Sequence, residues 1–213
     1  MVFLSEPQAY SCNLDLAAKP LSGTYNFALN SKDKLDPDIP LVKAKAQGGT
    51  MILWKVELDP YVAVHPVPST AFLPVIFNPP GALKSIHIAV YLPTLGHENE
   101  FVDELSKLTH LVRDLSNDNP NSPIFLRGGF NVNQKQRKRM ELLNHFCSEL
   151  SLRQVCFPKP TYHHFLGDGK SDSYLDRILF STSLTIHEAI TSIECKLDNP
   201  LIDSYHDLFS ILL

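Results

Sequence analysis

Short apolar runs separated by proline and glycine clusters make up most of the chain, and this pattern limits the fold more than any other feature. Each run has the length and alternation of a β-strand. Six of them precede any helical pattern: Val2–Leu4, Tyr25–Leu29, Thr50–Val56, Tyr61–His65, Phe72–Phe77 and Ile86–Tyr91. The cluster Asn78-Pro-Pro-Gly81 marks a turn between two of these runs. The first part of the chain is therefore predicted to form β-sheet.

The apolar spacing changes to three and four residues from Glu98 to Leu115, which predicts an amphipathic helix. A second helix is predicted from Asn133 to Leu150. Further strands are expected at Ile124–Leu126, Thr161–Phe165, Tyr174–Phe180, Ile186–Cys195 and Leu208–Leu213. Strands with two long helices between them indicate one α/β domain with mixed or antiparallel sheets, in which two sheets pack together.

Composition excludes some classes of protein. The 213 residues are 44% apolar and 20% charged, which is typical of a globular domain. A net charge of −4 argues against a dedicated nucleic-acid binder but allows an enzyme that binds DNA through a metal and a local patch. Four scattered cysteines favour reduced thiols in an intracellular protein, with a disulfide or zinc site as the alternative. We expect neither a membrane span nor a signal peptide.

Five polar residues stand at the ends of predicted strands or, in one case, in the middle of a strand, and could carry chemistry. Glu6 could hold Mg²⁺, although a Glu at a strand end is commonly a solvated surface group. Tyr91 taken alone is a core residue before a turn, and Asn131 taken alone is a turn residue. Asp176 interrupts an apolar strand, where a carboxylate needs a partner. His206 could be that partner, because a carboxylate next to an imidazole orients and charges a catalytic His.

The order of these motifs resembles the endonuclease/exonuclease/phosphatase superfamily, and within it the apurinic-like endonuclease domains of non-LTR retrotransposons. The resemblance covers nearly the whole chain. It rests on Glu6, Tyr91-Leu-Pro93, Gly128-Gly-Phe-Asn131, Thr161-Tyr-His-His164, Leu175-Asp-Arg-Ile-Leu179 and Ser204-Tyr-His206. It implies a DNase I-like α/β fold, a two-layer β-sandwich flanked by helices, formed by residues 1–213 as a single domain.

The resemblance also implies a function, which is hydrolysis of a phosphodiester in DNA with Mg²⁺, or Mn²⁺ in its place. Glu6 would hold the metal. Asn131 and His206 would contact the scissile phosphate, Asp176 would orient His206, and Tyr91 would support the phosphate side. The metal would act as a Lewis acid on the phosphate and the leaving group.

Three departures from the family pattern lie at functional positions. Gly129 replaces the Asp that orients and deprotonates the attacking water, and Tyr205 stands where many members carry an Asp near the metal. Because the chain starts within Val2–Leu4, the family's first strand, which carries an Asn, is expected to be missing. Loss of a general base typically costs about 10²–10⁴-fold in rate. We therefore expect weakened metal binding and impaired or absent hydrolysis.

Nucleic-acid contacts are expected beside this site. Arg137, Lys138 and Arg139 belong to a basic run that is either a solvated helix face or an edge that contacts phosphates. Thr161 and His163 lie in the segment that looks particularly like the retroelement branch. The expected partners are DNA and a reverse-transcriptase domain in the parent element, with a nuclear location if that origin holds. The alternatives are a non-catalytic nucleic-acid or protein-binding remnant and a phosphatase or phosphodiesterase of the same superfamily.

Overall fold

The computed structural model of the chain describes residues 1–5, 23–31, 49–155, 160, 162–166, 169–181, 192–196 and 208–212. Its strands are β1 (Val2–Ser5), β2 (Tyr25–Asn30), β3 (Thr50–Lys55), β4 (Val62–Val64), β5 (Phe72–Phe77), β6 (Ser85–Tyr91), β7 (Ile124–Gly129), β8 (Leu152–Gln154), β9 (Tyr162–Leu166), β10 (Gly169–Ser173), β11 (Asp176–Ser181), β12 (Ser192–Lys196) and β13 (Leu208–Leu212). Its helices are α2 (Glu98–Asp118), α3 (Arg137–Glu149) and the short 3-10 helix η2 (Val56–Tyr61). Every strand predicted above overlaps an observed strand, and both predicted helices are present.

The larger sheet has the strand order β4-β5-β6-β7-β11-β8. All of its neighbouring strands are antiparallel except β6 and β7, which are parallel because α2 lies between them in the chain. The smaller sheet has the order β1-β3-β2 and is antiparallel. In the described residues β9 pairs with β10 and β12 pairs with β13, again antiparallel.

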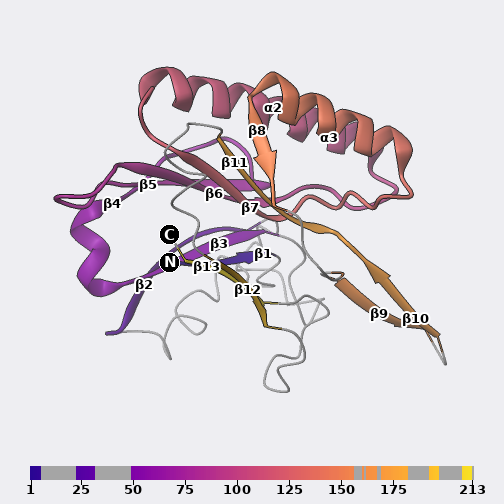
Figure 1. The fold of residues 1–213 in the computed structure, drawn as a ribbon, viewed down its shortest axis with the longest axis horizontal. Helices are drawn as coiled ribbons and strands as arrows, with labels where there is room; N and C mark the ends of the chain where they lie inside the picture. The colour runs from indigo at the N-terminus through magenta and orange to yellow at the C-terminus, as the bar shows by residue number, and fades with distance from the viewer. Residues whose placement is uncertain are drawn as a thin grey trace, which may run out of the picture.

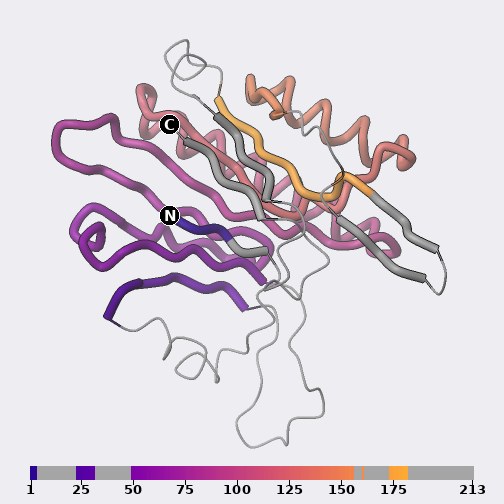
Figure 2. Tube along the Cα trace, turned by 60° about the horizontal axis from the view of Figure 1, so that its bottom comes forward, coloured from indigo at the N-terminus to yellow at the C-terminus, as the bar shows by residue number. Residues whose placement is uncertain are grey.

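These elements form layers (Figure 1). The helices α2 and α3 cover one face of the larger sheet, and the smaller sheet lies against the other face. The turned view of Figure 2 shows β11 running beside β7, with the smaller sheet as a separate layer. The predicted two-layer β-sandwich flanked by helices is confirmed. Among the described residues no helix is long and apolar enough to span a membrane.

The alternation of side chains along β6 shows how the layers are built. Ile86, Ile88 and Val90 point to the helices and are fully buried. Ala89 points the other way, into the core between the two sheets. Both faces of β6 are therefore covered, which explains why this strand reads as a nearly continuous apolar run in the sequence. The helix-side core continues on α2 at three- and four-residue spacing through Phe101, Leu105, Leu108, Val112 and Leu115.

Candidate functional site

Three of the predicted site residues form a row across three neighbouring strands. Gly129, the last residue of β7, pairs with Tyr91 at the end of β6 and with Asp176 at the start of β11. Strand alternation puts all three on the face toward the smaller sheet, because Ala89 points there and Leu179 of β11 points to the helices. The pairing of the sheet therefore brings together residues that lie far apart in the sequence.

Gly129 occupies the centre of this row. Its backbone is outside the left-handed region, so the conformation itself does not require glycine. A Cβ atom at this position would lie 3.0 Å from Cδ2 of Tyr91 and 3.9 Å from Nδ2 of Asn131. Gly128, in contrast, has a φ of 133°, which favours glycine. Gly128 is thus favoured by its backbone conformation, whereas the size of the residue at position 129 is limited by the neighbouring Tyr91 ring.

The turn after β7 ties the ends of the three strands together. The amides of Phe130 and Asn131 both donate to the carbonyl of Leu175, at 3.0 and 3.2 Å. The amide of Leu92 donates to the carbonyl of Gly129 at 2.8 Å. Asn131 is buried, has a φ of 54°, and donates its side-chain amide to the carbonyl of Leu92. Asn131 therefore fills the turn role that its position in the sequence indicates.

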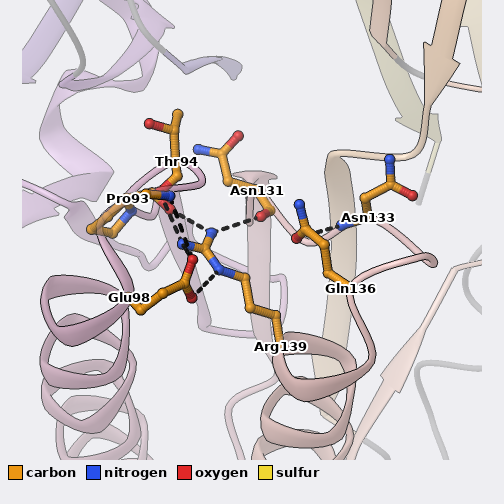
Figure 3. Close-up of polar contacts among 8 residues, drawn as sticks. Pro93, Thr94, Glu98, Asn131, Asn133, Gln136 and Arg139 are labelled. Carbon is orange, nitrogen blue, oxygen red and sulfur yellow. Dashed lines mark hydrogen bonds and ion pairs between the residues drawn. The ribbon is translucent and has the colours of Figure 1, made fainter.

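Arg139 braces this turn from the start of α3 (Figure 3). Its Nη1 donates to the carbonyls of Pro93 at 2.9 Å and Asn131 at 3.0 Å, and its Nη2 donates to the carbonyl of Thr94 at 2.9 Å. Its Nε and Nη2 also bind the two carboxylate oxygens of Glu98 at 2.8 and 3.0 Å. The guanidinium therefore connects the loop after β6, the turn after β7 and the start of α2.

The brace corrects one sequence-based interpretation. Arg139 is 2% exposed, and its guanidinium lies 4.2 Å from the centre of the Phe101 ring, so it does not belong to an exposed basic edge. Arg137 and Lys138 are exposed, as expected for a helix face. The hydrogen bonds from Arg139 lower the pKa of the Glu98 carboxyl below its ordinary value. The sequence offered no local signal for this pair, because its members lie 41 residues apart.

The structure places the remaining predicted residues as follows. Asp176 is 6% exposed and sits at the edge of the row. His163 lies on β9, opposite Asp172 of β10. Glu6, Thr161, Tyr205 and His206 lie outside the described residues. The structure thus brings together Tyr91, Gly129, Asn131 and Asp176, while the Asp176–His206 pair stays a prediction.

A divalent cation needs several oxygen ligands. Within the described ranges no three His, Cys, Asp or Glu side chains lie close enough to hold a metal ion. In the row itself Asp176 supplies a carboxylate and Gly129 supplies none. The described residues alone do not fit an Mg²⁺ site, and the role of Glu6 as a metal ligand stays a prediction.

Comparison of the sequence with models of known families and with characterised proteins gives no match. Comparison of the fold with solved structures does give matches. The chain is similar to the endonuclease domain of TRAS1, a telomere-specific non-LTR retrotransposon, with 13% identity and a TM-score of 0.64 over 100% of this chain and 99% of that one. It is also similar to the mannosyl-6-phosphatase Bt3783 of Bacteroides thetaiotaomicron, with 14% identity and a TM-score of 0.62 over 100% and 86% of the two chains.

A third solved structure is TDP2 of D. rerio in complex with a single-strand DNA product, with 12% identity and a TM-score of 0.54 over 98% of this chain and 83% of that one. Another similar structure is an endonuclease/exonuclease/phosphatase family protein from Bacteroides thetaiotaomicron. At these identities the likeness shows the fold. The chain has the DNase I-like fold of endonuclease/exonuclease/phosphatase structures, as its motifs predicted.

Proposed function

We propose that the chain is a retrotransposon-derived, endonuclease-like domain that binds DNA and has lost most or all of its hydrolytic activity. The observation that carries the proposal is the position of Gly129 between Tyr91 and Asp176. A carboxylate at the centre of this row would face the same space as Asp176. Glycine has no group that could orient a water molecule or take its proton.

The other predicted site residues would bind the phosphate or the metal. Asn131 would donate the second hydrogen of its side-chain amide to the phosphate, because the first is donated to the carbonyl of Leu92. Glu6 and His206 are proposed as the metal ligand and the second phosphate contact. When bound, Mg²⁺ would act as a Lewis acid on the phosphate. The expected effect of Gly129 is that substrate still binds while the attacking water is not activated.

DNA is the proposed partner because exposed cations follow the turn that holds Asn131. Arg137 and Lys138 begin α3, directly after the turn that holds Asn131. The Arg137 side chain is 92% exposed and pairs with Glu141 at 2.9 Å. Exposed ion pairs contribute little to stability, so Arg137 can exchange Glu141 for a phosphate at small cost. A nuclear location and a neighbouring reverse-transcriptase domain are part of the same proposal.

A second candidate function is phosphatase activity on a small substrate, and the likeness to a mannosyl-6-phosphatase favours it. The non-catalytic binding remnant predicted from the sequence differs from our proposal only in complete loss of turnover. One set of assays on the full chain distinguishes residual from complete loss of nicking, and separates both from phosphatase activity. Plasmid nicking, mannose 6-phosphate hydrolysis and duplex DNA binding are measured with Mg²⁺ and with Mn²⁺.

The proposal predicts DNA binding that weakens steeply with salt, with very slow or no nicking and no release of phosphate from mannose 6-phosphate. Lys138→Gln should weaken DNA binding and make its salt dependence shallower by about one unit of slope. The matched control is Arg113→Gln on α2, an equal charge change in a pair with Glu149 on the helix layer, which should leave binding unchanged. Phosphate release without DNA binding would favour the phosphatase instead.

A further inference from the structure

Arg127 is a cation in the core between the two sheets. It lies on β7 two residues before Gly129, so both residues face the smaller sheet. Its neighbours across the sheet are Ala89 on β6 and Ile178 on β11. This face of β7 therefore carries Arg127 below the row of candidate site residues.

Aromatic rings surround the guanidinium. Its carbon lies 4.6 Å from the centre of the Phe3 ring on β1 and 5.4 Å from the centre of the Phe125 ring. His87 stacks on Phe125 with ring centres 5.2 Å apart. Burial lowers the pKa of His87 to about 3, so this imidazole is neutral near pH 7. The positive charges near this stack are the Arg127 guanidinium and the α-ammonium of Met1, whose pKa is lowered by burial and by Arg127.

Among the described residues, the Arg127 guanidinium has fewer hydrogen-bond acceptors than the guanidinium of Arg139. Its Nε is buried without a hydrogen-bond partner, and in the described part of the chain no carboxylate forms an ion pair with it. Burial alone lowers the pKa of Arg127, to about 10, so it remains charged at neutral pH. Arg139, in contrast, donates to three carbonyls and a carboxylate, and Arg177 donates to the carbonyl of Val132 at 2.9 Å.

A half-buried charge without a carboxylate partner among the described residues is costly, and contacts with aromatic faces recover only part of that cost. An anion that enters the space would supply the missing acceptors. Arginine binds phosphate well, because its planar group donates two parallel hydrogen bonds. Part of Arg127 remains exposed, and Gly129, two residues along the same strand face, carries no side chain, so that the Tyr91 ring is the described side chain that lies against this end of the strand.

We infer that Arg127 is the binding residue of a metal-independent site for a phosphate group, entered from the edge at which Gly129 lies. The inference goes beyond the proposed function because it requires neither a metal nor hydrolysis. The inference also implies that glycine at position 129 has a second effect, on anion binding at Arg127. A carboxylate at position 129 would stand on the same strand face, about 6.6 Å along β7 from Arg127, and would compete with the anion for its charge.

Thermal unfolding of the full chain tests the site. Melting temperatures are measured in EDTA at constant ionic strength, with chloride replaced by inorganic phosphate, thymidine 5′-monophosphate or mannose 6-phosphate. For wild type, each tenfold rise in phosphate concentration above Kd should raise the melting temperature by an equal step. The two esters distinguish a nucleotide from a sugar phosphate as the natural source of the group. A response to inorganic phosphate and to neither ester would contradict a site for phosphate esters.

Three variants identify the responding group. Arg127→Met should remove the response and melt in chloride at or above the wild-type temperature, because it removes a half-buried charge and keeps the volume. Arg127→Lys should keep part of the response. Arg113→Met, an equal loss of charge on the helix layer, should respond as wild type does. A wild-type protein indifferent to phosphate, or an Arg127→Met protein that still responds, would overturn the inference.

A second measurement on wild type does not depend on the folding of the variants. The Nε–H resonance of Arg127 in ¹⁵N-arginine-labelled protein should shift on addition of phosphate in EDTA, because this group acquires its first acceptor. The Nε–H resonance of Arg139 already reports a bond to Glu98 and should stay in place. Movement of both resonances together, or of neither, would show that phosphate does not bind at Arg127. Loss of DNA binding with the phosphate response intact would refute the proposed function alone.

Discussion

A Cβ atom on Gly129 would lie 3.0 Å from Cδ2 of Tyr91, directly across the β6–β7 pair. Few real Cβ contacts are that close, so any larger residue at position 129 requires the Tyr91 ring to move by a few tenths of an ångström. The backbone at Gly129 sets no such limit, because its φ is outside the left-handed region. The limit on the size of the residue at position 129 therefore comes from the Tyr91 side chain and not from the backbone.

The Tyr91 contact can be measured by a double-mutant cycle. Gly129→Ala should destabilise the domain by about 1–3 kcal/mol, as overpacking does. In a Tyr91→Ala background the same change should cost close to nothing. Gly128→Ala is the matched control: its φ of 133° makes the cost a backbone effect that Tyr91→Ala does not relieve. Urea unfolding gives all the free energies, and equal coupling at both glycines would contradict the assignment.

The Arg139 brace predicts a large loss of stability on removal of one partner. Arg139→Met should cost about 1–3 kcal/mol, because it removes the donor to three carbonyls, among them that of the buried Asn131. Arg137→Met, two residues away and 92% exposed, should change the free energy of unfolding by less than about 0.5 kcal/mol. Chemical unfolding of both variants checks the pair. Similar small effects would mean that the brace is not formed in solution.

Asn131 separates backbone from side-chain effects in the turn. Asn131→Gly keeps the conformation at a φ of 54° and loses the hydrogen bond to Leu92, at a cost of about 1 kcal/mol. Asn131→Ala also puts a Cβ in the left-handed region without a local hydrogen bond, which adds about 1–2 kcal/mol. The expected order of unfolding free energies is wild type, then glycine, then alanine. If alanine is as stable as glycine, the left-handed conformation is wrong.

His87 predicts a specific dependence of stability on pH. Burial lowers its pKa from 6.5 to about 3, so between these values the unfolded state binds a proton that the folded state does not. Stability should fall as the pH drops from 6.5 towards 3, by up to about 1.4 kcal/mol per pH unit from this residue. His87→Leu should flatten this part of the profile measured by urea unfolding. An identical slope in both proteins would contradict a neutral, buried His87.

Most of the fold followed from local patterns, and the exceptions have physical causes. The strands β6 and β7 were predicted because apolar runs end there at clear turns. The second helix begins at Arg137, four residues later than predicted. Asn133 and Gln136 explain the delay: Asn133 Oδ1 accepts from the amide of Lys135 at 3.1 Å, and Gln136 Oε1 accepts from the amide of Asn133 at 3.3 Å. Such bonds compete with helix formation.

The sequence did not predict the elements and side-chain roles that depend on contacts with residues far away in the chain. β8 has three residues, and β10, with the sequence GKSDS, lacks apolar residues. Arg139 looked exposed because it follows other basic residues, while its partner Glu98 lies on another helix. Arg127 gave no periodic signal at all. The order of motifs located Tyr91, Gly129, Asn131 and Asp176, and the strand register then placed them together.

The central claim is that Gly129 removes the group that activates water, and Gly129→Asp tests it most directly. Nicking of supercoiled plasmid is measured with Mg²⁺ for wild type, Gly129→Asp and Gly129→Asn, with Gly129→Asp combined with Tyr205→Asp as a second step. Asn has the size of Asp but cannot take a proton, so it controls for crowding against Tyr91. We predict nicking that rises by about 10²-fold or more with Asp and stays at the wild-type level with Asn. Wild-type nicking as fast as that of Gly129→Asp would contradict the claim.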